Sequence, residues 1–352
     1  MGLVAAALIG AVSLTACGDD SSSGGTGGGT GGGGASSNLK IGMAYDLGGR
    51  GDKSFNDSAA VGLDKAKTEL GISSDNVREL SARPNETDND RATRLELLAK
   101  GGYNPVIAVG FAYAKALAKV APKYLNVKFG VVDAVTDDVK GPNVTNLVFA
   151  EEQGSYLVGA AAALKSTSGS IGFIGGCSVP LIAKFEAGYK AGAQKVKPDI
   201  KITSKYLSTP QQGCTGFNDP AAGTEAGKGM YDGGIDVVFA AAGGSGTGVF
   251  AAAKAAGKQA VGVDSDQYQS AAANVKDAII TSMLKRVDVS VLTFLKEVQD
   301  GTVKAGEQRF DLEADGVGYA TSGGKIDDIK TQLDDLKKQI VDGSITVPTT
   351  VS

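Results

Sequence analysis

Three aspartates directly follow short apolar runs of this chain, Asp46, Asp133 and Asp264, and a glycine pair, Gly243 and Gly244, follows another. A carboxylate can accept hydrogen bonds from the hydroxyl groups of a neutral ligand, and glycine lets the backbone approach a ligand closely. The chain contains no histidine, which removes the most frequent general base and the commonest metal ligand. These residue types favour binding over catalysis, so we expect neither an enzyme nor a bound metal or cofactor.

The elements that must position these residues alternate between apolar runs and amphipathic segments. The apolar runs predict strands at 39–45, 105–110, 127–132, 170–175, 236–241 and 260–263. Amphipathic segments such as SAAVGLDKAKTEL and TGVFAAAKAAG separate them and predict helices. This alternation is typical of an α/β protein with parallel sheets covered by helices, in which ligands bind at the carboxyl ends of the strands.

The pattern starts again in the middle of the chain, which indicates two doubly wound lobes. LKIGMAYD leads into a glycine-rich turn and a helix, and so does SIGFIGGCSVPLIAKFEAGYKAG. We predict an N-terminal lobe from 38–150 plus about 266–305, and a C-terminal lobe from 151–265 plus about 306–350. The acids and glycines at the strand ends would then face one another across a cleft.

The first seventeen residues are typical of an export signal. The apolar run ends in Leu-Thr-Ala-Cys followed by Gly18, which resembles the lipobox of bacterial lipoproteins and implies a lipid on Cys17. Residues 18–37 are almost entirely Gly, Ser and Thr, which predicts a flexible tether spanning about 25 Å. In an exported chain, Cys177 and Cys214 can form a disulfide, and we expect one because both lie in glycine-containing loops.

Five motifs, in order along the chain, resemble the basic membrane protein family of lipoprotein substrate-binding components of ABC importers. They are DKSFND (52–57), AAGGSGTGVFAAA (241–253), VGVDSDQ (261–267), TSMLKRVD (281–288) and IVDGSITVP (340–348). The resemblance implies the type I periplasmic binding protein fold, with two lobes joined by three crossovers. It also implies a receptor that binds purine nucleosides in the cleft and delivers them to a permease.

The resemblance also implies roles for particular residues. Phe55 would stack on the purine, and Asp46 and Asn56 would bind its edge. Asp264 and Lys285 would hold the ribose hydroxyls, assisted by Asp133 and by the backbone of Gly243 and Gly244. A second aromatic would close on the base from the other lobe, and we favour Phe239 over Phe185 and Phe217.

The local sequence is compatible with these roles. In DLGGRGDKSFNDSAAVG, Ser54 and Asp57 have the spacing of a helix capping box, which would hold Phe55 at the first turn of a helix. Lys285 falls in TSMLKRVDVSVLTFLKEV, whose pattern predicts an amphipathic helix. An anionic nucleotide would need several basic residues, and only Arg50, Lys53 and Lys285 are near these loops, so a nucleoside is favoured.

Three alternatives remain open. Residues 236–264 imitate a nicotinamide-binding βαβ unit, but the third glycine of that fingerprint falls on Val249. The same fold could instead bind a monosaccharide or another small signal, and a structural or adhesive lipoprotein is the third possibility. With a net charge of −4 we expect no nucleic-acid partner. We expect a monomer that is lipid-anchored at the outer face of the cytoplasmic membrane.

Overall fold

The computed structural model describes residues 38–351 of the chain. The predicted signal peptide, the predicted tether and Cys17 lie outside these described residues. Within residues 38–351, no helix combines the length and the apolar composition needed to cross a membrane.

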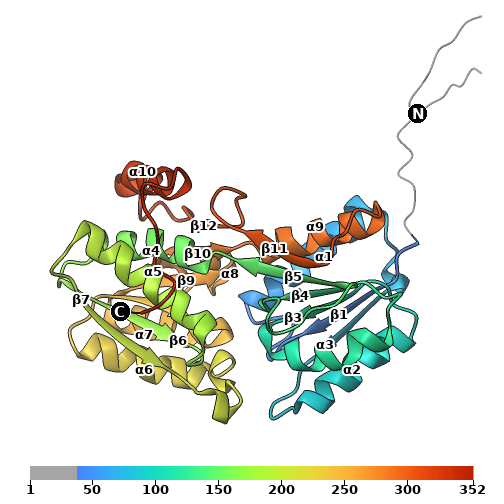
Figure 1. Ribbon diagram of the computed structural model, residues 1–352. Helices are drawn as coiled ribbons and strands as arrows, with labels where there is room; N and C mark the ends of the chain where they lie inside the picture. Colours follow the sequence, from blue (N-terminus) through green and yellow to red (C-terminus); the bar gives the residue numbers. More distant parts are fainter. Residues whose placement is uncertain (1–37, 352) are drawn as a thin grey trace, which may run out of the picture. The chain divides into compact units, whose positions relative to one another are not determined.

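The first of two six-stranded sheets is entirely parallel, with the strand order β11-β5-β4-β3-β1-β2. Its strands are β1 (Ile41–Tyr45), β2 (Val77–Ser81), β3 (Val106–Val109), β4 (Phe129–Val132), β5 (Val144–Phe149) and β11 (Gly306–Phe310). One face is covered by α1 (Phe55–Glu69) and α9 (Val287–Gln299), the other by α2 (Asp88–Lys100) and α3 (Ala114–Val120) (Figure 1). Because both faces are covered, β3 and β4 are buried at every position.

The second sheet repeats this plan, with the order β12-β10-β9-β8-β6-β7 and only β12 antiparallel to its neighbour. Its strands are β6 (Ser170–Gly175), β7 (Lys201–Tyr206), β8 (Val237–Ala241), β9 (Gln259–Asp264), β10 (Ile279–Lys285) and β12 (Val317–Tyr319). Its helices are α4 (Glu151–Lys165), α5 (Pro180–Val196), α6 (Pro220–Asp232), α7 (Gly246–Ala256), α8 (Gln267–Ser270) and α10 (Lys330–Val341). The α4–α5 pair covers one face and the α6–α7 pair covers the other (Figure 1).

The predicted α/β class with two doubly wound lobes is confirmed, and all six predicted apolar runs form strands. The chain passes between the lobes three times: at Ala150, at Arg286, and through residues 311–316. The predicted lobe boundaries were wrong in the last third of the chain. Strand β10, which we assigned to the first lobe, lies in the second sheet, and β11, which we assigned to the second lobe, completes the first sheet.

This error came from the segment TSMLKRVDVSVLTFLKEV, which is a strand followed by a helix. The strand β10 ends at Lys285, and α9 begins at Val287. Thr281 and Ser282 make the strand look half polar, yet both are buried, because Thr281 donates to the carbonyl of Ala320 (2.6 Å) and Ser282 accepts from the amide of Gln267 (3.1 Å). In the sequence, threonine and serine whose hydroxyls form hydrogen bonds with the backbone inside a sheet therefore produce the same pattern as the polar face of a helix.

Helix α4 begins immediately after the first crossover and packs unusually closely on α5. A Cβ atom on Gly188 would lie 2.1 Å from the carbonyl oxygen of Glu152, and one on Gly192 would lie 1.9 Å from that of Tyr156. The two helices thus meet through their backbones. This contact fixes the start of α4, where Glu151 is located.

Candidate ligand-binding site

The predicted aspartates lie at the carboxyl ends of strands, as expected. Asp46 follows β1, Asp133 follows β4, and Asp264 is the last residue of β9. Asp133 and Asp264 have φ angles of 69° and 65°, the left-handed conformation that non-glycine residues rarely adopt. The same uncommon backbone conformation therefore presents one carboxylate from each lobe, and such positions are frequent at functional sites.

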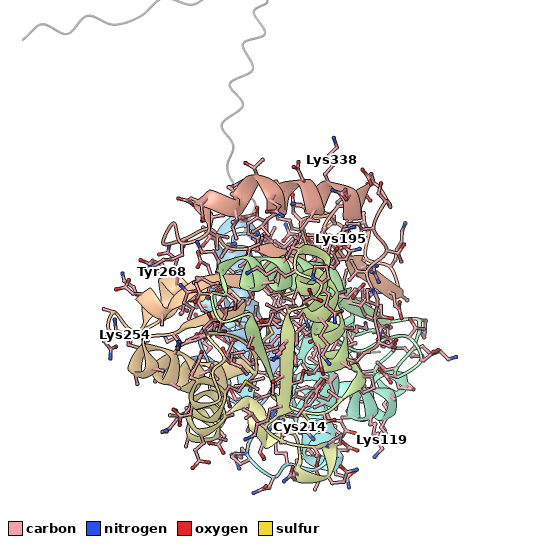
Figure 2. The ribbon with its side chains drawn as sticks, turned by 90° about the vertical axis from the view of Figure 1, so that its left-hand side faces the viewer. Lys119, Lys195, Cys214, Lys254, Tyr268 and Lys338 are labelled. Carbon is pink, nitrogen blue, oxygen red and sulfur yellow. A yellow bond between two sulfur atoms is a disulfide. The ribbon has the colours of Figure 1, made fainter. Side chains whose placement is uncertain are left out.

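Lys285 joins these strand ends into a buried charged cluster. Its Nζ atom donates to Oδ2 of Asp133 at 2.7 Å and lies 3.2 Å from Oε1 of Glu151. The side chains of Lys285, Asp133 and Glu151 are only 2%, 5% and 1% exposed. The labelled lysines of Figure 2, by contrast, lie at the surface of the molecule: Lys119, Lys195, Lys254 and Lys338. Lys285 is not the solvated helical lysine that the local pattern predicted.

Burial controls the protonation of the two aspartates. It raises the pKa of Asp133 to about 6, even though the Lys285 ammonium favours the charged form. Burial raises the pKa of Asp264 to about 7, again against the attraction of Lys285 and the hydrogen bond from Ser54. For Lys285 itself, burial would lower the pKa, but the carboxylates of Asp133, Glu151 and Asp264 hold it above the ordinary lysine value.

Three phenylalanine rings surround the same ammonium group. The Nζ atom of Lys285 lies 5.3 Å from the ring centroid of Phe55, 5.1 Å from that of Phe149 and 5.5 Å from that of Phe185. Phe55 opens α1 in the first lobe, and Phe185 belongs to α5 in the second. A cation over the face of an aromatic ring, within about 6 Å of its centroid, is attracted by the ring's quadrupole, so Lys285 helps to hold these rings in place.

The loop before Phe55 is built around Asp52. Its carboxylate accepts from the backbone amides of Ser54 (2.9 Å), Asn56 (2.8 Å) and Asp57 (3.0 Å). The predicted capping box of Ser54 and Asp57 was therefore wrong: Ser54 makes no side-chain cap. Its hydroxyl instead donates to Oδ2 of Asp264 at 2.5 Å.

This hydroxyl is part of a direct connection between the lobes. The carbonyl oxygen of Lys53 accepts from Nε2 of Gln267 at 2.8 Å and from the hydroxyl of Ser265 at 3.3 Å. Lys53 and Ser54 belong to the first lobe, whereas their partners lie at the end of β9 or just after it. The glycine-rich turn therefore contacts the second lobe around Asp264.

Hydrogen bonds connect Asn56 with Asp46 and Leu47 in the turn between β1 and α1. The amide of Asp46 donates to Oδ1 of Asn56 (3.0 Å), while Nδ2 of Asn56 donates to the carbonyl of Leu47 (3.2 Å) and to Asp52 (2.9 Å). The side chain of Asn56 is thus fully used within the turn. Burial raises the pKa of Asp46, whose Oδ2 atom lies 2.6 Å from the place where a Cβ of Gly110 would be. Glycine at 110 is required to leave room for this carboxylate.

Phe239 is not the second aromatic of the site. Its side chain is fully buried in the core, where the ring centroid lies 5.6 Å from that of Phe173 and 5.3 Å from that of Tyr189. Residue 239 is the middle residue of β8, and alternation along the strand turns its side chain toward the covering helices. Of the two other candidates, Phe217 lies at strand ends of the second lobe, and Phe185 lies beside Lys285.

Phe217 lies over the ends of β6 and β8. A Cβ atom on Gly176 would be only 2.3 Å from Cδ1 of Phe217, and the carbonyl oxygen of Phe217 would be 3.0 Å from a Cβ on Gly243. Its ring meets Phe111 of the first lobe edge-on, with centroids 6.4 Å apart. Sequence reasoning noted Phe111 after the strand predicted at 105–110 but assigned it no role, and it missed Glu151, whose only signal is that it follows closely after an apolar run.

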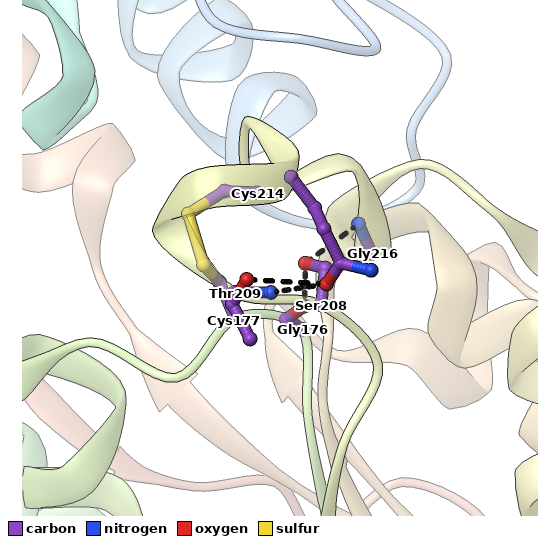
Figure 3. Close-up of a disulfide and its surroundings, with 7 residues drawn as sticks. Gly176, Cys177, Ser208, Thr209, Cys214 and Gly216 are labelled. Atoms are coloured by element: carbon purple, nitrogen blue, oxygen red, sulfur yellow. Dashed lines mark hydrogen bonds between the residues drawn. A yellow bond between two sulfur atoms is a disulfide. The ribbon is translucent and has the colours of Figure 1, made fainter.

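The two cysteines form the predicted disulfide, with a Cα–Cα distance of 5.1 Å between Cys177 and Cys214 (Figure 3). A cavity of about 510 Å³ opens beside the charged cluster. It is lined by Arg50 and Lys53 of the turn before α1, by the start of α1, by the end of β9 with Asp264, and by the β10–α9 crossover. Phe55, Asp133 and Lys285 do not line this cavity but contact one another next to it.

Comparison with known proteins gives consistent matches over nearly the whole described chain. Residues 39–350 match the family described as "ABC transporter substrate-binding protein PnrA-like". The "ABC transporter nucleoside-binding protein BmpA" of Lactococcus lactis is 32% identical over 326 residues, covering 89% of this chain and 90% of its own. An uncharacterized lipoprotein of Pyrococcus horikoshii is 34% identical over 291 residues, covering 80% and 68%. The crystal structure of an ABC transporter solute-binding protein from Aeropyrum pernix superposes with a TM-score of 0.76 and 27% identity, covering 89% and 94%.

Proposed function

Because this chain belongs to the Bmp family of PnrA-like ABC transporter substrate-binding proteins, we propose that its substrate is a purine nucleoside. As a substrate-binding protein it has a small-molecule ligand, a permease as partner and an extracytoplasmic location. The observation that carries the nucleoside proposal is the contact of Phe55 with Lys285, whose ammonium also binds Asp133 beside Asp264.

An aromatic ring next to paired hydrogen-bonding charges suits a base joined to a sugar. Stacking of a base on an aromatic side chain contributes about 1–3 kcal/mol. In the proposed complex Phe55 provides that face from the first lobe. Phe185 or Phe217, which come from the second lobe, would provide the opposite face.

The sugar would be held by the charged cluster. A carboxylate accepts hydrogen bonds from two neighbouring hydroxyls, and charged hydrogen bonds are about twice as strong as neutral ones. Asp133 and Asp264 supply such acceptors from opposite lobes, and Lys285 supplies a donor. Glu151 adds a third carboxyl group, which pairs with Lys285 at 3.2 Å and with Lys184 at 3.6 Å. A phosphate would meet more acids than bases here, which favours a nucleoside over a nucleotide.

The remaining predicted contacts are part of the same proposal. Asp46 would bind the edge of the base, and the backbone of Gly243 and Gly244 would approach the ligand at the end of β8. We assign Asn56 to holding the turn that carries Phe55, because its own groups are bonded within that turn.

We also propose that the protein is anchored by a lipid on Cys17 at the outer face of the cytoplasmic membrane. The support is the lipobox-like sequence Leu-Thr-Ala-Cys-Gly and the following Gly/Ser/Thr-rich segment. The lipoprotein name of the Pyrococcus horikoshii relative agrees with this proposal. Labelling with a radioactive or clickable fatty acid, with Cys17→Ser as the control, tests it directly.

Isothermal titration calorimetry with adenosine, guanosine, inosine, free ribose and AMP tests the ligand. We expect micromolar or tighter binding of at least one nucleoside and much weaker binding of ribose and AMP. Phe55→Ala should weaken nucleoside binding at least tenfold, a change of 1.4 kcal/mol. Phe250→Ala is the matched control, because it removes an equally large ring from the outer face of the second sheet. If no nucleoside releases or absorbs heat, the proposal is wrong, and tight ribose binding would favour a sugar receptor.

A further inference from the structure

The loop between β7 and α6 carries Phe217 to the strand ends of the second lobe. It contains two short 3-10 helices, η4 (Pro210–Gln212) and η5 (Thr215–Phe217). Residues 209–213 are all exposed. The hydrophobic core therefore does not hold residues 209–213. Phe217 packs against the edge of that core but is only partly buried, so the core alone does not anchor the segment that leads to it.

Besides the backbone hydrogen bonds from Leu207 to Gly175 and from Ser178 to Ser208, two side-chain connections attach this loop to the end of β6 (Figure 3). The first is the disulfide from Cys214 to Cys177, which is fully buried two residues beyond β6. The second is the hydroxyl of Ser208, which donates to the carbonyl of Gly176 at 2.7 Å and accepts from the amide of Gly216 at 3.0 Å. Both connections end within one residue of each other on the β6 side.

The backbone around Cys214 explains why the covalent connection is needed. Gly213 and Cys214 have φ angles of 70° and 52°, so two successive residues adopt the left-handed conformation. Glycine tolerates this conformation, but cysteine adopts it only when its surroundings impose it. This reversal directs η5 back toward Gly176, where the ring of Phe217 fills the space that any side chain at 176 would need.

We propose that the Cys177–Cys214 disulfide is a positioning element of the ligand site, because it holds Phe217 in place as the aromatic wall of the second lobe. This inference rests on the proposed nucleoside-binding function. The wall faces the first lobe, since the Phe217 ring contacts Phe111 and the side-chain oxygen of Asn218 would lie 3.6 Å from a Cβ on Gly48. Without the disulfide, the loop that carries Phe217 would have to become ordered each time a ligand binds.

A double-mutant cycle tests this role. We expect Phe217→Ala to weaken nucleoside binding about fivefold or more, the effect of losing one base–aromatic contact. The variant carrying Cys177→Ser and Cys214→Ser should weaken binding about fivefold, the effect of ordering a few side chains on binding. Adding the two serine substitutions to Phe217→Ala should cause no further loss. If the serine variant binds like the unaltered protein, or if the losses multiply in the triple variant, the disulfide does not act through Phe217.

Leu98→Ala is the control for general loss of stability. Leu98 is fully buried in the first lobe, on the face of the sheet covered by α2 and α3. This substitution should lower the melting temperature but leave the nucleoside affinity unchanged. An equal loss of affinity in Leu98→Ala would assign the effect of the serine variant to stability and overturn the proposal.

Hydrogen exchange measured without ligand separates this inference from the proposed function. In the serine variant, the amides of Gly216, Phe217 and Asn218 should exchange at least tenfold faster, while those of β6 and β8 should keep their protection. Unchanged exchange in residues 214–218 would refute the positioning role even if nucleosides bind. Should no nucleoside bind the unaltered protein, the proposed function fails, and the exchange result alone decides whether the disulfide orders Phe217.

Discussion

Replacement of Lys285 by methionine is the most informative single change to the charged cluster. Methionine has a similar length, so it leaves the space filled but removes the charge that Asp133 and Glu151 face. Removing one partner of a buried ion pair costs about 3–5 kcal/mol, because the other charge stays buried and unpaired. We therefore expect Lys285→Met to lower the free energy of unfolding by about 3–5 kcal/mol at pH 7.5.

The same reasoning predicts how this loss depends on pH. Burial already raises the pKa of Asp133 to about 6 in the presence of the lysine charge. Without Lys285 this pKa rises further, so the folded variant takes up a proton that the unfolded chain has released. Stability of the variant should then fall as the pH rises, and the difference from the unaltered protein should shrink at pH 5.

Urea-induced unfolding at pH 5 and pH 7.5, followed by circular dichroism, measures both quantities. Lys296→Met is the matched control, because Lys296 pairs with Glu69 at 2.6 Å and the two side chains are 44% and 45% exposed. Exposed pairs contribute about 0–1 kcal/mol, so the control should change little. A loss below about 1 kcal/mol for Lys285→Met, or an equal loss at both pH values, would refute the argument that Lys285 compensates buried carboxylates in this cluster.

Three further outcomes follow from the same geometry. Asp264→Asn should reduce the fall in stability between pH 4 and pH 7 by about 4 kcal/mol, because that is the loss that a raised pKa of about 7 against an ordinary 3.8 implies; the contribution of Asp133, whose pKa is raised to about 6, should remain. In calorimetry the same variant should bind nucleoside at least tenfold more weakly; unchanged affinity would exclude Asp264 from the site. Gly188→Ala should destabilise the protein by about 1–3 kcal/mol in thermal unfolding, since its Cβ would lie 2.1 Å from the Glu152 carbonyl. Gly229→Ala on α6, where nothing lies within 4 Å of the new atom, should be neutral or stabilising, and equal losses in both variants would argue against the close α4–α5 contact.

The elements with strong local signals could be predicted from the sequence. Continuous apolar runs predicted the strands, and the position of Asp46, Asp133 and Asp264 after such runs placed them at one edge of each sheet. The glycine-containing loops around Cys177 and Cys214 favoured the disulfide. These inferences needed only the periodicity of a strand and the topology of a parallel sheet.

The errors concern partners that are distant along the chain. Ser54 and Asp57 have the spacing of a capping box, but the Ser54 hydroxyl donates a hydrogen bond to Asp264, which is 210 residues away in the sequence. Phe239 is the middle residue of β8 and not its end, and the direction of its ring depends on which face α4 and α5 cover. Glu151 reads as an acid in the first turn of a helix, and only the crossover brings it to Lys285.

The interleaved origin of the two sheets has a consequence for biogenesis. The edge strand β11 of the first sheet is followed within the same short stretch by β12, the edge strand of the second. If the chain emerges from a secretion channel with its amino terminus first, the first sheet lacks its edge strand until Phe310 has emerged. The second sheet lacks its edge strand until Tyr319 has emerged. Each sheet therefore exposes an unpaired strand edge until late in emergence, and such edges are prone to aggregation.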